Sequence, residues 1–179
     1  NPVIPIVLSL NIYGDKRLAV NGESDEKFQQ RVLDMAAKTG NPVVTFYNSV
    51  GAKLEEGLAA LSGSAAVAAA VAKVSGVVPQ IAVVTGVCGA GSALAAAAAD
   101  VCIVSKEGEL FLTAPFTSAA AGDKLEGAGS AEFAAKAGVA AIVVDSAEEA
   151  AAKAAELVGL LPANNLAPPC LSRPLLRAR

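Results

Sequence analysis

Apolar residues recur along the chain in two patterns, as short continuous runs and as residues spaced three or four apart, and these patterns predict strands alternating with helices. The runs at 3–11, 43–46, 81–87 and 141–145 are rich in β-branched residues, which is typical of strands covered on both faces of a parallel sheet. Prolines near the start of the first run indicate an edge strand. The pattern therefore predicts an α/β domain.

The first expected helix follows a turn at 14–15 and a short strand at 18–20. Ser24 is expected to cap it, Gly40 to end it and Pro42 to prevent its continuation. One face of this helix should be buried by apolar side chains at helical spacing. These are Phe28, Val32, Met35 and Ala36.

Further helices are expected at about 54–75, 92–99 and 130–136. Ser146 and Glu149 form a capping box that should open a last helix ending at Leu161, with Leu157 and Val158 docking it. The segment 116–129 is rich in Ala, Gly, Ser and Thr and is expected to be an irregular loop that could act as a lid. We expect one compact domain over residues 1–162 and a tail or linker at 163–179.

Composition narrows the functional class. Of 179 residues, 54% are hydrophobic, but much of this is alanine, and no strongly apolar run is long enough to predict a membrane span. Alanine-rich helices instead suggest close packing and a homo-oligomer. The net charge of −3 argues against nucleic-acid binding, because clustered arginines occur only in the tail.

The chain has no histidine and three cysteines that form no CxxC pair. Neither a disulfide framework nor a metal site is therefore expected, and a reducing, cytoplasmic location is favoured. The lack of histidine also removes the commonest general base, so catalysis would have to use the backbone and the substrate.

The stretch 86–91, GVCGAG, turns sharply between a buried strand and an alanine-rich helix. Peptide N–H groups of Gly89, Ala90 and Gly91 there would suit a developing oxyanion, since glycines allow close approach and the helix N-terminus favours negative charge. Taken alone, however, this loop favours a plain turn whose glycines serve packing. A second strand-to-helix turn lies at 48–52, and both turns could face one cleft at the carboxyl edge of the sheet.

Four motifs in order add specificity. They are NSVGAKLEEGL at 48–58, SGVVPQI at 75–81, the turn at 86–91 with Asp100 downstream, and LPANN at 161–165. Together they resemble the N-terminal half of biotin-dependent acyl-CoA carboxyltransferase β subunits, of the propionyl-CoA and methylmalonyl-CoA type, or the related decarboxylase α subunits. The resemblance covers roughly residues 25–165.

The resemblance implies a crotonase-like (ClpP/crotonase) spiral of ββα units that transfers a carboxyl group between biotin and a short acyl-CoA. It implies that the 86–91 turn holds the thioester enolate and that CoA lies along Val50, Gly51, Ala52 and Lys53, with Phe116 nearby. Carboxybiotin would come from a biotin carboxyl carrier protein or domain, with no metal. A companion C-terminal half would complete the site, in a trimer or hexamer.

Some residues depart from the family pattern. Asn48 and Lys53 stand where the family has Asp and Arg, the segment 126–131 lacks the family's histidine, and alanines replace bulky residues after the glycine turn. Two alternatives stay open, a crotonase-type acyl-CoA hydratase or isomerase, which needs a carboxylate near the turn, and a catalytically silent scaffold subunit.

Several polar residues near the motifs are assigned structural roles from the sequence. Glu55 and Glu56 are expected to favour a helix N-terminus. Cys88 is expected to be a small buried residue rather than a nucleophile, and Asp100 to accept a backbone hydrogen bond.

Overall fold

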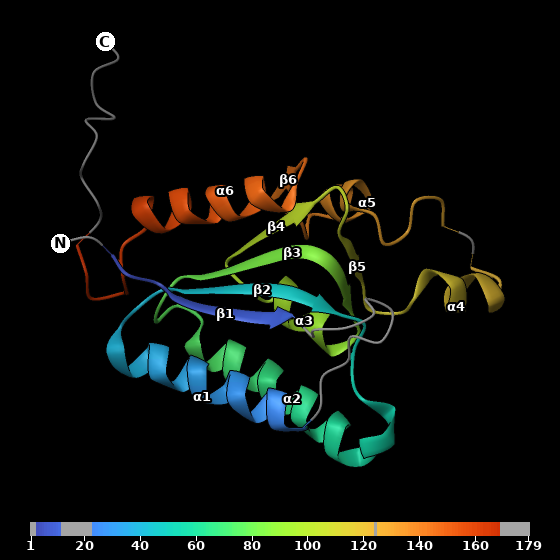
Figure 1. Ribbon diagram of the computed structural model, residues 1–179, viewed down its shortest axis with the longest axis horizontal. Helices are drawn as coiled ribbons and strands as arrows, with labels where there is room; N and C mark the ends of the chain where they lie inside the picture. Colours follow the sequence, from blue (N-terminus) through green and yellow to red (C-terminus); the bar gives the residue numbers. More distant parts are fainter. Residues whose placement is uncertain (1–2, 12–22, 124, 169–179) are drawn as a thin grey trace, which may run out of the picture.

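A parallel sheet forms the centre of the molecule in the computed structural model, which describes residues 3–11, 23–123 and 125–168 (Figure 1). The strand order is β1-β2-β3-β4-β6, and β5 pairs with the carboxyl end of β3. The strands are β1 (Ile6–Asn11), β2 (Val43–Ser49), β3 (Gln80–Gly89), β4 (Val101–Ser105), β5 (Glu109–Phe111) and β6 (Ile142–Val144). Because the order along this path follows the chain, each crossover advances the sheet by one strand, as in a spiral.

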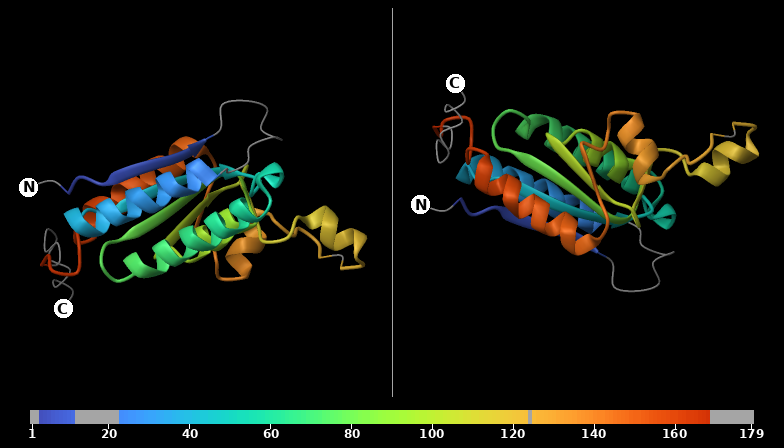
Figure 2. Two further views of the ribbon diagram at one scale, coloured as in Figure 1. Left: turned by 90° about the horizontal axis from the view of Figure 1, so that it is seen from below. Right: turned by 90° about the horizontal axis from the view of Figure 1, so that it is seen from above.

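Helices cover both faces of the sheet. The helices α1 (Glu23–Thr39), α2 (Leu58–Val74) and α3 (Gly91–Ala97) lie on one face, and α6 (Ala147–Leu160) lies on the other (Figures 1 and 2). The short helices α4 (Pro115–Ala120) and α5 (Ala131–Lys136) follow β5, and α4 extends away from the sheet (Figure 2). Within the described ranges, no helix is both long and apolar enough to cross a membrane.

The two faces are sorted by alternation along the central strands. On β3, Ala82 and Val84 belong to the cluster beneath α1, α2 and α3, whereas Ile81 and Val83 belong to the cluster beneath α6. Successive side chains of a strand point to opposite faces, so an unbroken apolar run is what a two-sided core requires. The strand predictions made from those runs are confirmed, and β1 is an edge strand.

The helix predictions are confirmed in type but need correction in detail. The first helix begins at Glu23, so Ser24 lies inside it instead of capping it. Its predicted buried face is confirmed at Val32 and Ala36, which are both buried. The prediction is wrong at Phe28 and Met35, which are 56% and 54% exposed, while Glu26 and Leu33 are buried. The predicted helix at 54–75 is divided into a 3-10 helix, η2 (Leu54–Glu56), and α2, since Gly57 breaks it with a φ of 53°.

The segment 116–129 is not wholly irregular. Pro115 opens α4, and a proline fits the first position of a helix because its N–H would have no acceptor there. At the far end, α6 is as predicted, since the Ser146 hydroxyl accepts the Glu149 N–H at 3.2 Å and Val158 is buried. The expected turn at 14–15, the strand at 18–20 and most of the tail lie outside the described residues.

The domain boundary expected at residue 162 stays a prediction. Beyond it, the Asn164 side-chain amide donates to the Gly40 carbonyl at 2.8 Å, and the Asn165 N–H donates to the Val77 carbonyl at 3.0 Å. The LPANN segment is thus hydrogen-bonded to the residue after α1 and to the connection between α2 and β3.

Candidate active site

Two strand-to-helix turns meet at the carboxyl edge of the sheet. Ser49, the last residue of β2, pairs with Cys88 of β3. A Cβ atom on Gly51 would lie 3.1 Å from the Ala90 Cβ, and one on Gly89 would lie 2.8 Å from the Val50 carbonyl oxygen. The segments predicted to face a common cleft are therefore in direct contact, and glycines at 51 and 89 make that approach possible.

The reversal of the chain is later and tighter than the sequence suggested. The expected turn at 86–91 is strand as far as Gly89, because β3 continues beside β5, with Val87 opposite Glu109 and Gly89 opposite Phe111. The pairing of β2 with β3 shifts register between Tyr47 and Ser49, which marks an irregularity where β3 curves (Figure 1). The turn itself is Ala90, and α3 begins at once with Gly91.

Ala90 holds a backbone conformation that favours glycine. Its φ of 53° and ψ of −124° make it the one non-glycine residue with positive φ in the described part of the chain. Its N–H donates to the Phe111 carbonyl at 3.1 Å, and its carbonyl accepts the Leu94 N–H at 3.2 Å. Strained backbone of this kind is concentrated at functional sites, where the surrounding structure holds it in place.

The bonds of Ala90 decide which donors the turn can offer. Because the Ala90 N–H is already used by Phe111, it is not directed at a ligand. Gly91 is the first helical residue, so its N–H has no acceptor within the helix. Of the three residues expected to form an oxyanion hole, Gly91 therefore offers the clearest donor.

A buried carboxylate that sequence reasoning missed lies beside this turn. Glu26 on α1 is 1% exposed, and its Oε1 accepts the Ser64 hydroxyl at 2.6 Å. Ser64 in turn abuts Gly91, whose Cβ would lie 2.9 Å from the Ser64 Cβ. The carboxylate fits only because residue 63 is glycine, since a Cβ there would overlap it.

The predicted CoA-side residues lie around the first turn. Gly51 is buried with a φ of 126°, and its N–H donates to the Ser49 hydroxyl at 3.3 Å. Ala52 lines a small cavity together with Glu26 and Gly91. Lys53 is exposed, and its Nζ lies 3.6 Å from Glu56 Oε1 in η2, so its ammonium stands at the surface close to the turns.

Phe116 is not brought to the turns. It lies on α4 and is 80% exposed, and it is not among the described residues that line the large cavity beside that helix. Phe111 is the aromatic residue that contacts the turn, since a Cβ on Gly89 would lie 2.8 Å from its Cε2. The period-two pattern around Phe111 marks a strand, and nothing in it indicated this contact.

Two further residues have the structural roles expected of them. Cys88 is fully buried, and burial raises the pKa of its thiol, so the reactive thiolate is disfavoured. Asp100 follows α3, and its Oδ2 accepts the Gln80 N–H at 2.8 Å at the start of β3. Burial and this hydrogen bond are the features expected of structural residues.

Three features define a crotonase-like fold. The parallel strands follow the chain in a spiral, the strained Ala90 turn leads directly into the N-terminus of α3, and the Gly51 turn packs against the Ala90 turn. Comparisons with known proteins place the chain within that class. It matches the carboxyl transferase domain family over residues 11–177. The chain belongs to this family.

Relatives and solved structures agree with this assignment. The 12S subunit of methylmalonyl-CoA carboxyltransferase from Propionibacterium freudenreichii subsp. shermanii is 38% identical over 94 residues, which are 52% of this chain and 18% of the relative. The propionyl-CoA carboxylase carboxyltransferase subunit of Haloferax mediterranei is 30% identical over 78% of this chain and 28% of its own length. The crystal structure of transcarboxylase 12S matches with a TM-score of 0.77 and 32% identity, over 82% of this chain and 29% of that one.

The Pseudomonas aeruginosa geranyl-CoA carboxylase β subunit also matches, with a TM-score of 0.72 and 29% identity, over 80% of this chain and 28% of that chain. The chain thus spans less than a third of the length of each of these proteins. The chain therefore matches one portion of each of these longer proteins.

Proposed function

We propose that this chain is the acyl-CoA-binding portion of a biotin-dependent carboxyltransferase or decarboxylase. The observation that carries the proposal is the contact between the Gly51 turn and the strained Ala90 turn, which aims the N-terminus of α3 at the carboxyl edge of the sheet. Family membership supports the same reaction class.

In this reaction the thioester carbonyl of an acyl-CoA becomes an enolate, and its oxygen gains negative charge. The Gly91 N–H and the positive end of α3 would stabilise that charge. Lys53, exposed beside the first turn, would attract the phosphates of CoA. Carboxybiotin, bound to its carrier, would supply the carboxyl group and, after releasing CO2, a base for the α-proton, so no histidine of this chain is needed.

The proposal also includes the partners of this chain, which are a biotin carrier, a companion carboxyltransferase half and further copies of the chain itself. Transcarboxylase 12S, whose structure resembles this chain, forms a hexamer assembly and binds substrate in a multienzyme core. We extend this to the present chain as a trimer or hexamer that pairs with a C-terminal carboxyltransferase half. Light scattering at micromolar concentration should give a mass of three or more chains, and a clean monomer would contradict the assembly.

Ligand binding is tested most directly by thermal unfolding with CoA thioesters. A ligand that binds only the folded state at about 100 times its Kd adds about 2.7 kcal/mol to the unfolding free energy. For a chain of this size that corresponds to roughly 5–10 °C in Tm. No shift with any CoA thioester at saturating concentration would overturn the proposal.

The role of the turn is tested by removing one donor. A proline at residue 90 is unsuitable, because Ala90 has positive φ and its N–H already donates to Phe111. Gly91→Pro removes the candidate donor at a helix position that accepts proline. Carboxyl transfer, with the companion half and carrier supplied, should fall on the order of 10²- to 10³-fold.

Gly91→Ala controls for the added Cβ, because it makes the same Cβ contact with Ser64 but keeps the N–H. Gly91→Pro should lose more stability, since proline also restricts the conformation of Ala90, so both variants must show wild-type-like circular dichroism before their rates are compared. If Gly91→Pro is no slower than Gly91→Ala, the N–H of Gly91 does not hold the enolate.

A hydratase is the second candidate, and Glu26 is the observation that bears on it. Such an enzyme needs a carboxylate near the turn, and Glu26 is the buried carboxylate there. Glu26 accepts a hydrogen bond from Ser64 and occupies the space that a Cβ at residue 63 would fill, so it is packed between α1 and α2. This packing favours a structural role. Hydration of crotonyl-CoA should therefore be undetectable, and activity lost in Glu26→Gln would restore this candidate.

A further inference from the structure

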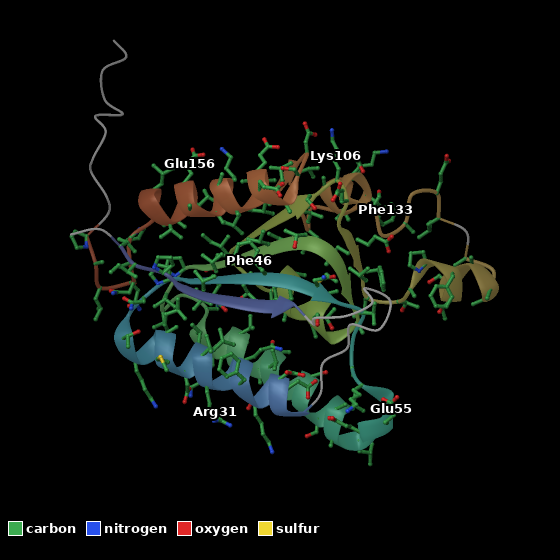
Figure 3. All side chains as sticks on the ribbon, viewed as in Figure 1. Arg31, Phe46, Glu55, Lys106, Phe133 and Glu156 are labelled. Atoms are coloured by element: carbon green, nitrogen blue, oxygen red, sulfur yellow. The ribbon has the colours of Figure 1, made fainter. Side chains whose placement is uncertain are left out.

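A large apolar cavity lies next to the Ala90 turn. It has a volume of about 690 Å³ and is bounded by α3, β5, α4 and α5. Its walls include Ala93, Leu94, Phe111, Leu125 and Phe133, and Figure 3 shows Phe133 on α5 at this side of the molecule. A cavity of this size and character is typical of sites that bury a small organic molecule.

Two parts of the cavity wall are neighbours of the turn, although Gly89, Ala90 and Gly91 are not among the described residues that line it. Phe111 lines the cavity, and its carbonyl accepts the Ala90 N–H. Ala93 and Leu94 line it from the first turn of α3, which begins at Gly91. An acyl group whose thioester oxygen is held at Gly91 therefore has this cavity within reach of its hydrocarbon end.

The residues on α3 determine how much of the cavity is open to a ligand. The side chains that face the cavity from this helix are Ala93, Leu94 and Ala97, so two of three are no larger than a methyl group. Leu94 and Leu125, which both line the cavity, are 51% and 64% exposed. A ligand that covers such apolar side chains gains free energy from removing them from water.

We propose that this cavity takes the hydrocarbon chain of the acyl group. The substrate is then a CoA thioester of an apolar acid longer than the short acyl-CoA expected from family resemblance. The inference rests on the proposed function, because it requires the thioester to be held at the turn. An acyl group of two or three carbons would cover less of this apolar wall than a longer chain and would gain less free energy from the cavity.

Titration calorimetry with the full chain tests the inference, using CoA, propionyl-CoA and octanoyl-CoA as probes. Each methylene buried in the cavity should tighten binding by up to about fourfold. Octanoyl-CoA, with five more methylenes than propionyl-CoA, should then bind at least about 30-fold more tightly. Equal affinities for the two thioesters would overturn the inference and leave the proposed function standing, whereas no binding of any thioester would overturn both.

Matched variants locate the acyl chain. Ala97 and Ala98 are neighbouring exposed residues at the end of α3, but only Ala97 lines the cavity. Ala97→Leu should reduce the preference for octanoyl-CoA over propionyl-CoA by about tenfold, while Ala98→Leu keeps it. Nonspecific adsorption of the longer chain would not distinguish the two variants.

A second pair on α4 covers the case in which α3 does not accept a larger residue. Ala119 lines the cavity and Ala120 does not, and both are exposed. Ala119→Leu should reduce the octanoyl preference and Ala120→Leu should not. If both cavity variants fold and retain the full preference, the acyl chain does not occupy this cavity and the inference is wrong.

Discussion

Ala90 and Gly57 have the same backbone conformation, although only one of them is glycine. Each precedes a helix with a φ of 53° and a ψ of −124°, Gly57 before α2 and Ala90 before α3. A side chain at such angles is strained, by roughly 1–3 kcal/mol. The chain therefore tolerates strain at the candidate active site and avoids it at a similar helix start beyond η2.

Replacing the strained alanine should stabilise the protein. Ala90→Gly relieves the unfavourable φ, while the unfolded chain gains entropy that offsets part of this benefit. We expect the unfolding free energy to rise by about 1 kcal/mol and Tm by about 2–4 °C. Thermal and urea unfolding of the variant measure the change.

Gly57→Ala provides the opposite test, because nothing lies within 4 Å of a Cβ atom at residue 57. Its cost is therefore one of backbone conformation alone, and Tm should fall by a similar amount. If Ala90→Gly lowers Tm as Gly57→Ala does, the Ala90 conformation is not strained in the way its dihedral angles indicate.

Gly89 offers a harsher test of the contact between the turns. Gly89→Ala would bring a Cβ within 2.8 Å of the Val50 carbonyl oxygen, which is backbone and cannot rotate away. We expect a loss of about 3 kcal/mol or more in unfolding free energy, measured by denaturant unfolding. Gly159→Ala, where a Cβ meets nothing within 4 Å, should not destabilise the fold.

At the scale of single residues, the sequence predicted which two turns lie together but not which backbone groups remain available there. Glycine spacing and motif order identified the 48–52 and 86–91 segments, because glycine marks backbone approach that no other residue allows. Which N–H remains available depended on Phe111, whose carbonyl reaches Ala90 through the β3–β5 pairing. Glu26 was missed because a glutamate on a helix normally faces water, and only Gly63 and Ser64 across the α1–α2 contact reveal its burial.

The elements themselves were predicted best where local and tertiary signals agree. The strands at 81–87 and 141–145 and the capped helix after Ser146 were found because their apolar patterns match the faces that they bury. In α1 the two signals agree only in part. Val32 and Ala36 are buried as their spacing predicts, whereas Phe28 and Met35 are exposed. Glu26 is buried instead, through its contact with Gly63 and Ser64 of α2, which the amphipathic pattern of the isolated helix does not indicate.

The cap of α6 should contribute measurably to stability. Ser146→Ala removes the hydroxyl that accepts the Glu149 N–H and leaves the Glu149 bond to the Asp145 N–H without its partner in the capping box. The expected cost is about 1 kcal/mol, seen as a fall of about 2–4 °C in Tm. A fall of the same size in Ser118→Ala, which removes a hydroxyl within α4, would show that the loss is not due to capping.

At the scale of the whole molecule, three ionisable groups are enclosed between the sheet and the α1–α3 layer. Tyr47, Cys88 and Cys102 are each at least 96% buried, and they belong to one apolar cluster. Burial in low-dielectric surroundings disfavours the charged form and raises the pKa of all three. The apolar core thus contains three groups whose protonated form is favoured by the fold.

Stability should therefore fall at alkaline pH. The pKa of Cys102 is raised by burial from 9.0 to about 11. Between these values the unfolded chain releases the thiol proton and the folded chain keeps it, so the unfolding free energy decreases as pH rises, by up to about 1.4 kcal/mol per pH unit for each such group. Below pH 9 these groups are protonated in both states, and they should produce no slope.

Urea unfolding between pH 7 and 11 measures this window. The Cys88→Ala and Cys102→Ala double variant is the control, because it removes both thiols while keeping the surface charges. It is less stable at pH 7, since two buried sulfur atoms are lost, but its unfolding free energy should decline less steeply above pH 9. An equally steep decline in the double variant would assign the alkaline loss to other groups and show that the buried thiols titrate normally in the folded chain.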